Sequence, residues 1–88
     1  MCFIIEEIYS ISYNLTNVES TNKQTVIAAD GTYVTKLVGL INNVSVTMNG
    51  TDITSSVYNS VTSEIRIDSS NTTIKTVTGD LVITATGA

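Results

Sequence analysis

The feature that most constrains the fold is a repeated alternation of apolar and polar side chains with a period of two. The segment Val44–Asn49 reads VSVTMN, and the segment Leu81–Thr86 reads LVITAT. Successive side chains of a strand point to opposite faces of its sheet, so this pattern indicates half-buried β-strands. No window of eleven or more residues keeps the 3.6-residue period of a helix. The chain is therefore predicted to consist of strands, with at most a single turn of helix.

Turn residues divide this pattern into short segments. Strands are predicted at Tyr9–Leu15, Thr25–Ala28, Thr32–Leu40, Val44–Asn49, Ile65–Ile67, Thr72–Val77 and Leu81–Thr86. A loop or irregular edge is predicted from Asn17 to Lys23, and a short irregular element around Ile53, Val57 and Tyr58. Turns are expected at Asp30-Gly31, Asn42-Asn43, Asn49-Gly50 and Thr78-Gly79-Asp80, because Gly, Asn and Asp accept the backbone angles that tight turns need.

Six or seven short strands with turns every 8 to 12 residues are typical of a small antiparallel β-sandwich or barrel. A β-grasp fold, whose first and last strands are parallel, would give the same alternation and is kept as an alternative. Apolar residues in phase on each strand predict the core. They are Ile11, Tyr13, Leu15, Tyr33, Leu37, Val44, Val46, Ile65, Ile67, Leu81 and Ile83. Tyr9 is also expected to be core, while the position of Tyr58 stays open.

Size and charge limit the classes of partner. A chain of 88 residues fits one domain, and its 42% of apolar and 14% of charged residues favour folding over disorder. The net charge is −4, and the four cations are scattered along the sequence. Nucleic acid is not expected as a partner, because binding to its backbone needs clustered Lys and Arg.

Membrane insertion and secretion are not expected either. No apolar run approaches the roughly 20 residues that span a bilayer. Near Met1 there is no basic segment, and Glu6 and Glu7 interrupt the apolar run, so a secretory signal is not predicted. Cys2, the single cysteine, cannot form an internal disulfide.

The side chains do not suggest an enzyme. The chain has no His, the usual base beside a nucleophile, and its many Ser and Thr fit the solvent faces of strands. Asp30, Asp52, Asp68 and Asp80 each neighbour Gly, Ser or Thr, where Asp serves turns through local backbone hydrogen bonds. A Ca²⁺ loop would need several oxygen ligands in a short spacing, and the string beginning at Asp68 offers one carboxylate. We therefore expect no catalytic residues, no cofactor and no metal.

Four segments together resemble a small β module of tailed-bacteriophage structural proteins and of some bacterial surface proteins. They read YSISYNLTNV, GTYVTKL, VSVTMNGTDIT and VTGDLVITATG, and the resemblance runs from Tyr9 to the end of the chain. The family's usual strand and turn read V-x-V-T-M-G-G-x-D-I-T. Asn49 replaces the first of those glycines, and Asn also tolerates the left-handed backbone region.

The resemblance implies an immunoglobulin-like or related fold and a non-enzymatic role in the virion, as capsid decoration or as a tail or baseplate appendage. A decoration protein docking in many copies on the capsid is the first expectation, which would place the chain in the virion. Its partners would be a major capsid or tail protein, or further copies of itself. The alternative is an adhesion module that binds carbohydrate or protein on the host surface.

The segment that precedes the resemblance is unusually apolar for a chain terminus. Residues 1–8 include Phe3, Ile4, Ile5 and Ile8, whereas solvated termini are usually polar. The segment is predicted either to extend the first strand or to act as an arm that docks on a neighbouring protein or another copy. The expected organisation is thus an arm or strand extension at 1–8 and one β domain at 9–88, with these four residues as the candidate docking site.

Overall fold

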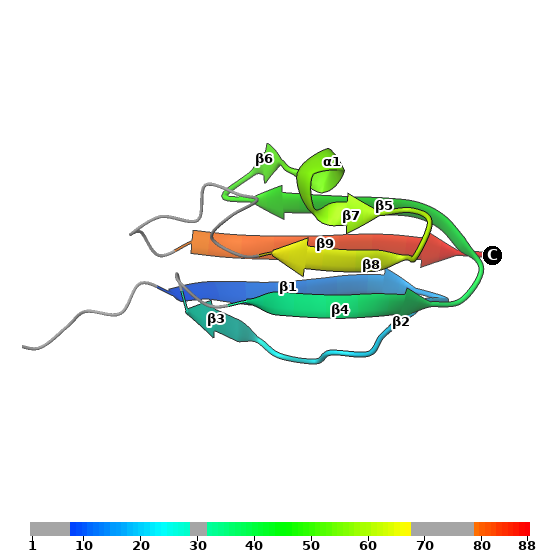
Figure 1. The fold of residues 1–88 in the computed structure, drawn as a ribbon, viewed down its shortest axis with the longest axis horizontal. Coiled ribbons are helices and arrows are strands. Elements are labelled where there is room, and N and C mark those ends of the chain that lie inside the picture. The colour runs from blue at the N-terminus through cyan, green and yellow to red at the C-terminus, as the bar shows by residue number, and fades with distance from the viewer. Residues whose placement is uncertain (1–7, 29–31, 68–78) are drawn as a thin grey trace, which may run out of the picture.

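The protein forms two β-sheets that face each other, as seen in a computed structural model that describes residues 8–28, 32–67 and 79–88 (Figure 1). The first sheet has the order β3-β1-β9-β5-β6 and the second the order β2-β4-β8-β7. In chain order the strands are β1 (Ile8–Thr16), β2 (Glu19–Ser20), β3 (Val26–Ala28), β4 (Tyr33–Val38), β5 (Ile41–Met48), β6 (Thr51–Asp52), β7 (Tyr58–Asn59), β8 (Glu64–Ile67) and β9 (Gly79–Gly87). A single-turn helix, α1 (Thr54–Val57), precedes β7. The predicted all-β sandwich is confirmed.

The first sheet is built around β9, which lies between β1 and β5. It runs parallel to β1, with partners from Tyr9↔Gly79 to Thr16↔Thr86, and antiparallel to β5. The other described strand pairs are antiparallel. A parallel first and last strand is the feature shared with the β-grasp alternative, but here the strands form two separate sheets.

The core lies between the sheets. Of the predicted core residues, eight are buried and pack in one cluster: Ile11, Tyr33, Leu37, Val46, Ile65, Ile67, Leu81 and Ile83. Tyr13, Leu15 and Val44 are partly buried and pack against that cluster. Val18, Ile27, Val57 and Ala85 also belong to it although the prediction did not include them.

Two predicted turns are located differently in the structure. Asn42 and Asn43 lie inside β5, where a register shift between Ile41 and Asn43 accommodates them, and the chain reverses before β5 at Gly39, with φ 137°. Gly79 and Asp80 form the first two residues of β9. The predicted loop at Asn17–Lys23 contains the short strand β2. The predicted turn at Asp30-Gly31 and the strand at Thr72–Val77 lie outside the described residues.

The turn at Asn49-Gly50 is confirmed. Both residues have positive φ, 52° and 85°, and they connect Met48 to its partner Thr51. Two central residues with positive φ define the type I′ turn, whose twist matches that of the flanking strands. The predicted limit of one helical turn also holds for the described residues, where α1 has four residues.

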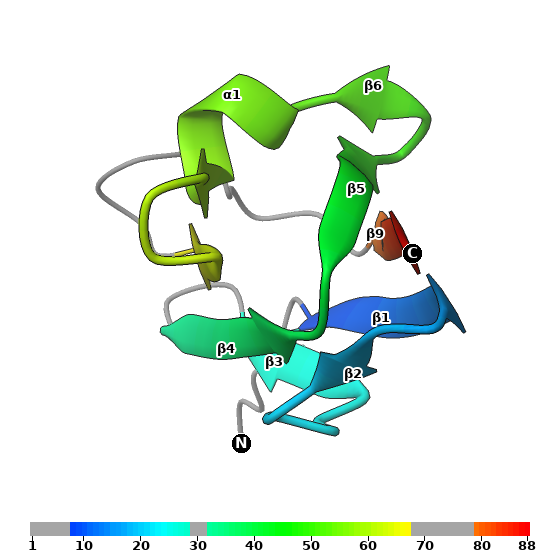
Figure 2. The ribbon, with the colours of Figure 1, turned by 90° about the vertical axis from the view of Figure 1, so that its right-hand side faces the viewer.

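The two sides of the sandwich are closed differently (Figure 2). On one side the segment from Thr21 to Thr25 connects the sheets: Thr21 N–H donates to Lys36 O at 3.0 Å, and Ile11 N–H donates to Thr25 O at 2.8 Å. On the other side, between β5 and β7, α1 makes the connection. Thr54 Oγ1 accepts a hydrogen bond from Val46 N–H at 2.8 Å, and Ile53 N–H donates to Val46 O at 2.8 Å.

Candidate functional site

Most of the predicted docking site lies outside the described residues. Phe3, Ile4 and Ile5 belong to that part of the chain, as does Cys2. Ile8 is the first residue of β1, where its backbone pairs with Ala28. The strand extension therefore accounts for Ile8, and the role of the other three stays a prediction.

Three exposed apolar residues lie in or next to the connections at one end of the sandwich. Among the described residues, the exposed large hydrophobics are Val26 (48%), Val38 (51%), Leu40 (74%) and Val61 (90%). Val38 ends β4, Leu40 lies in the connection to β5, and Val61 lies in the connection from β7 to β8. Both connections lie at the end of the molecule that holds the C-terminus (Figure 1). We call Val38, Leu40 and Val61 the apolar end.

Hydrogen bonds and close packing hold the two connections of the apolar end. Asn59 Oδ1 accepts hydrogen bonds from Val61 N–H at 2.9 Å and Thr62 N–H at 3.4 Å. Leu40 O accepts one from Ala88 N–H at 2.8 Å. A Cβ added at Gly87 would lie 2.8 Å from Leu40 O, so the end of β9 and this connection are in close contact. Exposed side chains on an ordered backbone lose little further backbone entropy on binding.

A groove opens between the two sheets at the apolar end. Its volume is ≈ 370 Å³, and residues 39–42, Val44, Tyr58, Ser60 and Ser63 line it. Val44 and Tyr58 are partly buried and pack against the core, so they give the groove an apolar floor. The polar side chains of Asn42, Ser60 and Ser63 belong to the same lining. The groove can thus receive apolar side chains from a partner while its polar lining offers hydrogen bonds.

The sequence prediction missed this site. It assigned Leu40 to the end of a strand and did not consider Val61. A usable signal was present, since both are large apolar residues placed in turns, Leu40 after Gly39 and Val61 between Ser60 and Thr62. The groove itself depends on the facing of β5 and β7, which no local pattern indicates.

The tyrosines predicted as core form a hydrogen-bonded pair inside the sandwich. Tyr33 is fully buried, and its hydroxyl lies 2.7 Å from that of Tyr13, which donates to Gln24 O at 2.6 Å. The single hydroxyl proton of Tyr13 is used in the bond to Gln24 O, so in the bond between the two hydroxyls Tyr33 donates and Tyr13 accepts. Burial raises the pKa of Tyr33 strongly and that of Tyr13 as well. These hydroxyls link two sheets and do not face a binding surface. The side chain of Tyr9 is not described.

The described aspartates accept hydrogen bonds from backbone N–H groups and neighbouring hydroxyls. Asp52 accepts hydrogen bonds from Thr54 Oγ1 at 2.5 Å and Thr54 N–H at 2.9 Å, and these bonds lower the pKa of Asp52. Asp80 lies in β9, where the turn interpretation was wrong, and its Oδ1 accepts a bond from Ser10 Oγ at 2.7 Å. Asp30 and Asp68 lie outside the described residues. Within 8–28, 32–67 and 79–88, no three side chains of the metal-binding types gather.

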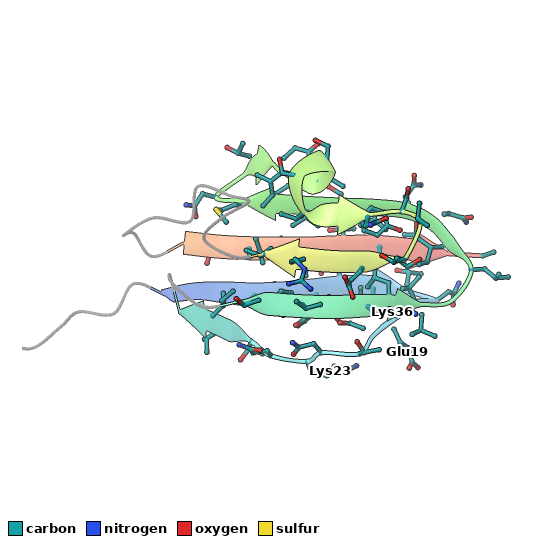
Figure 3. All side chains as sticks on the ribbon, in the orientation of Figure 1. Glu19, Lys23 and Lys36 are labelled. Atoms are coloured by element: carbon teal, nitrogen blue, oxygen red, sulfur yellow. The ribbon has the colours of Figure 1, made fainter. Side chains whose placement is uncertain are left out.

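The labelled charges lie along β2, β4 and the segment after β2. Glu19, Lys23 and Lys36 are exposed on that side of the sandwich (Figure 3). An acidic side chain thus shares the region with the two lysines, and the backbone of Glu19 pairs with that of Val38. In the described part of the chain, no helix is long and apolar enough to cross a membrane.

The chain matches no family model, no curated protein and no solved structure. What it does must therefore be inferred from its own residues and from the arrangement of the apolar end.

Proposed function

We propose that the chain is a non-enzymatic structural protein of a tailed-bacteriophage virion, an accessory protein that decorates the capsid in many copies. The resemblance of the segments YSISYNLTNV and VSVTMNGTDIT to the phage β module supports the virion setting. The observation that carries the proposal is the apolar end. It presents large hydrophobic side chains to solvent, which mark protein interaction sites when they gather on one surface.

The form of the apolar end suits docking on a protein. Leu40 and Val61 are large apolar side chains that are 74% and 90% exposed. Their two connections flank a groove with an apolar floor and a polar lining. An apolar centre with polar groups around it is the usual anatomy of a protein interface.

Counting the protein in purified particles tests the proposal. Particles from the strain that carries the gene would be purified on a density gradient and measured by quantitative mass spectrometry. A copy number of the same order as that of the major capsid protein is expected. Absence of the protein from the particles would refute the proposal.

Variants of the apolar end, measured in the same experiment, test which surface docks on the capsid. Leu40→Asp and Val61→Asp should each lower the copy number, because a charge in an apolar interface loses its hydration. Val26→Asp is the matched control, since Val26 is also exposed but lies in β3, away from the apolar end. Equal copy numbers for all three variants would show that another surface docks.

Host-surface adhesion is the second candidate, and Tyr58 favours it. This half-buried aromatic lines the groove together with Asn42, Ser60 and Ser63. An aromatic face beside convergent polar groups is what a sugar site needs. A glycan array probed with the purified chain tests this candidate. Tyr58-dependent binding, with few copies per particle, would favour adhesion over decoration.

A further inference from the structure

The groove at the apolar end coincides with an unpaired edge of the first sheet. In β5, only Thr47 and Met48 pair with β6. Val46 directs its N–H and C=O away from β9, where Thr54 Oγ1 and Ile53 N–H satisfy them. Backbone groups of an antiparallel strand alternate in direction, so Val44 points its own N–H and C=O to the same side. Among the described residues, no strand pairs with that side of β5 between Ile41 and Ser45.

An extended segment would fit both the unpaired edge of β5 and the groove beside it. Pairing with the edge beside Val44 would satisfy backbone groups, and side chains on one face of the added strand would enter the groove over Val44 and Tyr58. This combination of an open edge and alternate side-chain pockets is the basis of β-strand addition. The occupant should therefore be a short extended segment with apolar residues at alternate positions.

We propose that the occupant is the segment Met1–Glu7 of a second copy of this chain. Its sequence is MCFIIEE, in which Phe3 and Ile5 share one face of an extended strand. Those two side chains enter the groove, and its backbone pairs with β5 from Ile41 to Ser45. Glu6 lies on the opposite face of the strand, and Glu7, which shares the face of Phe3 and Ile5, follows the part that pairs with β5 and remains in solvent.

The reach of the chain excludes the same copy's segment. The segment is joined to the sandwich at Ile8, near the level of Gly79, whereas Val44 lies at the level of Ala85, towards the opposite end of β9. Six residues along β9 correspond to about 20 Å, and crossing from β1 to β5 adds about 10 Å. Phe3, five residues before Ile8, reaches at most about 18 Å from it. Only a neighbouring copy can bring Phe3 and Ile5 to the groove.

Because Ile8, to which the segment is joined, and the groove lie at opposite ends of the first sheet, copies would join head to tail. Such a heterologous contact forms rings where the rotation closes and filaments where it does not. The inference deepens the proposed function by naming one partner of the apolar end, and it rests on that function only for its setting. The contact itself is a property of the purified chain.

A mixing experiment with two full-length variants tests the proposal by sedimentation velocity. The double variant Phe3→Asp/Ile5→Asp cannot donate, and the variant Leu40→Asp cannot accept. The parent should show a mass that rises with concentration, and each variant alone should be monomeric. Mixed together, they should form a 1:1 complex, because one retains the groove and the other the segment. The control Val26→Asp should associate like the parent.

Several results would overturn the proposal. These are a monomeric parent at all concentrations, variants that associate like the parent, and a mixture that stays monomeric. Circular dichroism of each variant checks the fold. If Phe3→Asp/Ile5→Asp unfolds, the segment belongs to the chain's own core and the proposal fails. The copy number in particles is independent of these results, so failure of the head-to-tail contact remains distinguishable from failure of the capsid role.

Discussion

At the scale of single residues, Asn49 has two tasks, of which a glycine could perform only the first. Its backbone has φ 52°, within the region that Asn tolerates. Its Oδ1 accepts a hydrogen bond from Asp80 N–H at 2.9 Å, while Asn49 N–H donates to Asp80 O at 2.8 Å. The turn is thereby tied to the start of β9, which fixes the position of the hairpin on the first sheet.

Substitutions in this turn should separate backbone strain from the side-chain bond. Gly50→Ala should lower the free energy of unfolding by about 1 to 2 kcal/mol, because φ is 85° and a Cβ there meets nothing within 4 Å. Asn49→Gly should cost about 1 kcal/mol for the lost hydrogen bond alone. Urea unfolding measures both. A neutral Gly50→Ala would contradict the type I′ geometry.

The Tyr13 and Tyr33 hydroxyls should make the stability of the folded state depend on pH in the alkaline range. Burial raises the pKa of Tyr33 above its ordinary value near 10, so the folded state favours the neutral form. Below about pH 10 the Tyr33 phenol is neutral in both the folded and the unfolded state. Its full contribution to the free energy of unfolding is then present. As the pH rises further, the unfolded state ionises first and stability falls.

The melting temperature should therefore decline above about pH 10, and Tyr33→Phe should reduce the steepness of that decline. The substitution removes one titrating group while Tyr13 keeps its bond to Gln24 O. Thermal unfolding followed at several alkaline pH values gives the comparison. An equally steep decline in Tyr33→Phe would place the alkaline transition elsewhere.

At the scale of elements, α1 closes one side of the sandwich through Thr54 and Val57. Thr54 Oγ1 accepts a hydrogen bond from Val46 N–H in the first sheet. The helical turn then leads directly into β7 of the second sheet. Val57 from the same turn is buried in the core.

Thr54→Val should destabilise the protein by about 1 to 3 kcal/mol, the cost of leaving a partly buried N–H unpaired. The shape of the side chain is retained, so packing changes little. Ser55→Ala, an exposed position of the same helix, is the matched control and should be near neutral. Hydrogen exchange at Val46 N–H gives a local readout, which should accelerate in Thr54→Val only.

At the scale of the whole molecule, stability comes from the contact of the two sheets. Leu81 of the first sheet and Ile65 of the second are almost completely buried in one cluster. The buried polar residues of the second sheet are paired as well: Ser20 Oγ of β2 bonds to Thr35 Oγ1 of β4, and the Asn22 N–H also donates to that Thr35 oxygen, at 3.1 Å. The apolar core therefore holds the two sheets together, and the polar network ties β2 to β4 within the second sheet.

Leu81→Ala and Ile65→Ala should each cost about 2 to 4 kcal/mol, a large fraction of the stability of a small domain. Val61→Ala is the control, because that side chain is 90% exposed and should leave the unfolding midpoint unchanged. Chemical denaturation measures all three. Unchanged midpoints for both core variants would contradict the facing of the two sheets.

Local patterns determined the longer described strands, most of the core and the hairpin turn. Tyr33, Val46, Leu81 and Ile83 were predictable because alternation records which face of a strand is buried. The dipeptide Asn49-Gly50 was predictable because few residues accept two successive positive φ angles. These properties depend on neighbours in sequence, so the sequence alone determines them.

Tertiary structure decided the parallel pairing of β1 with β9, the burial of Val18 from a predicted loop, and the place of Asn42 and Asn43 inside β5. It also decided the candidate site, since Leu40 and Tyr58 come together only where β5 and β7 face each other. Each of these features depends on segments far apart in the chain. Pairing across such distances is set by the packing of whole sheets, which alternation within one segment does not encode.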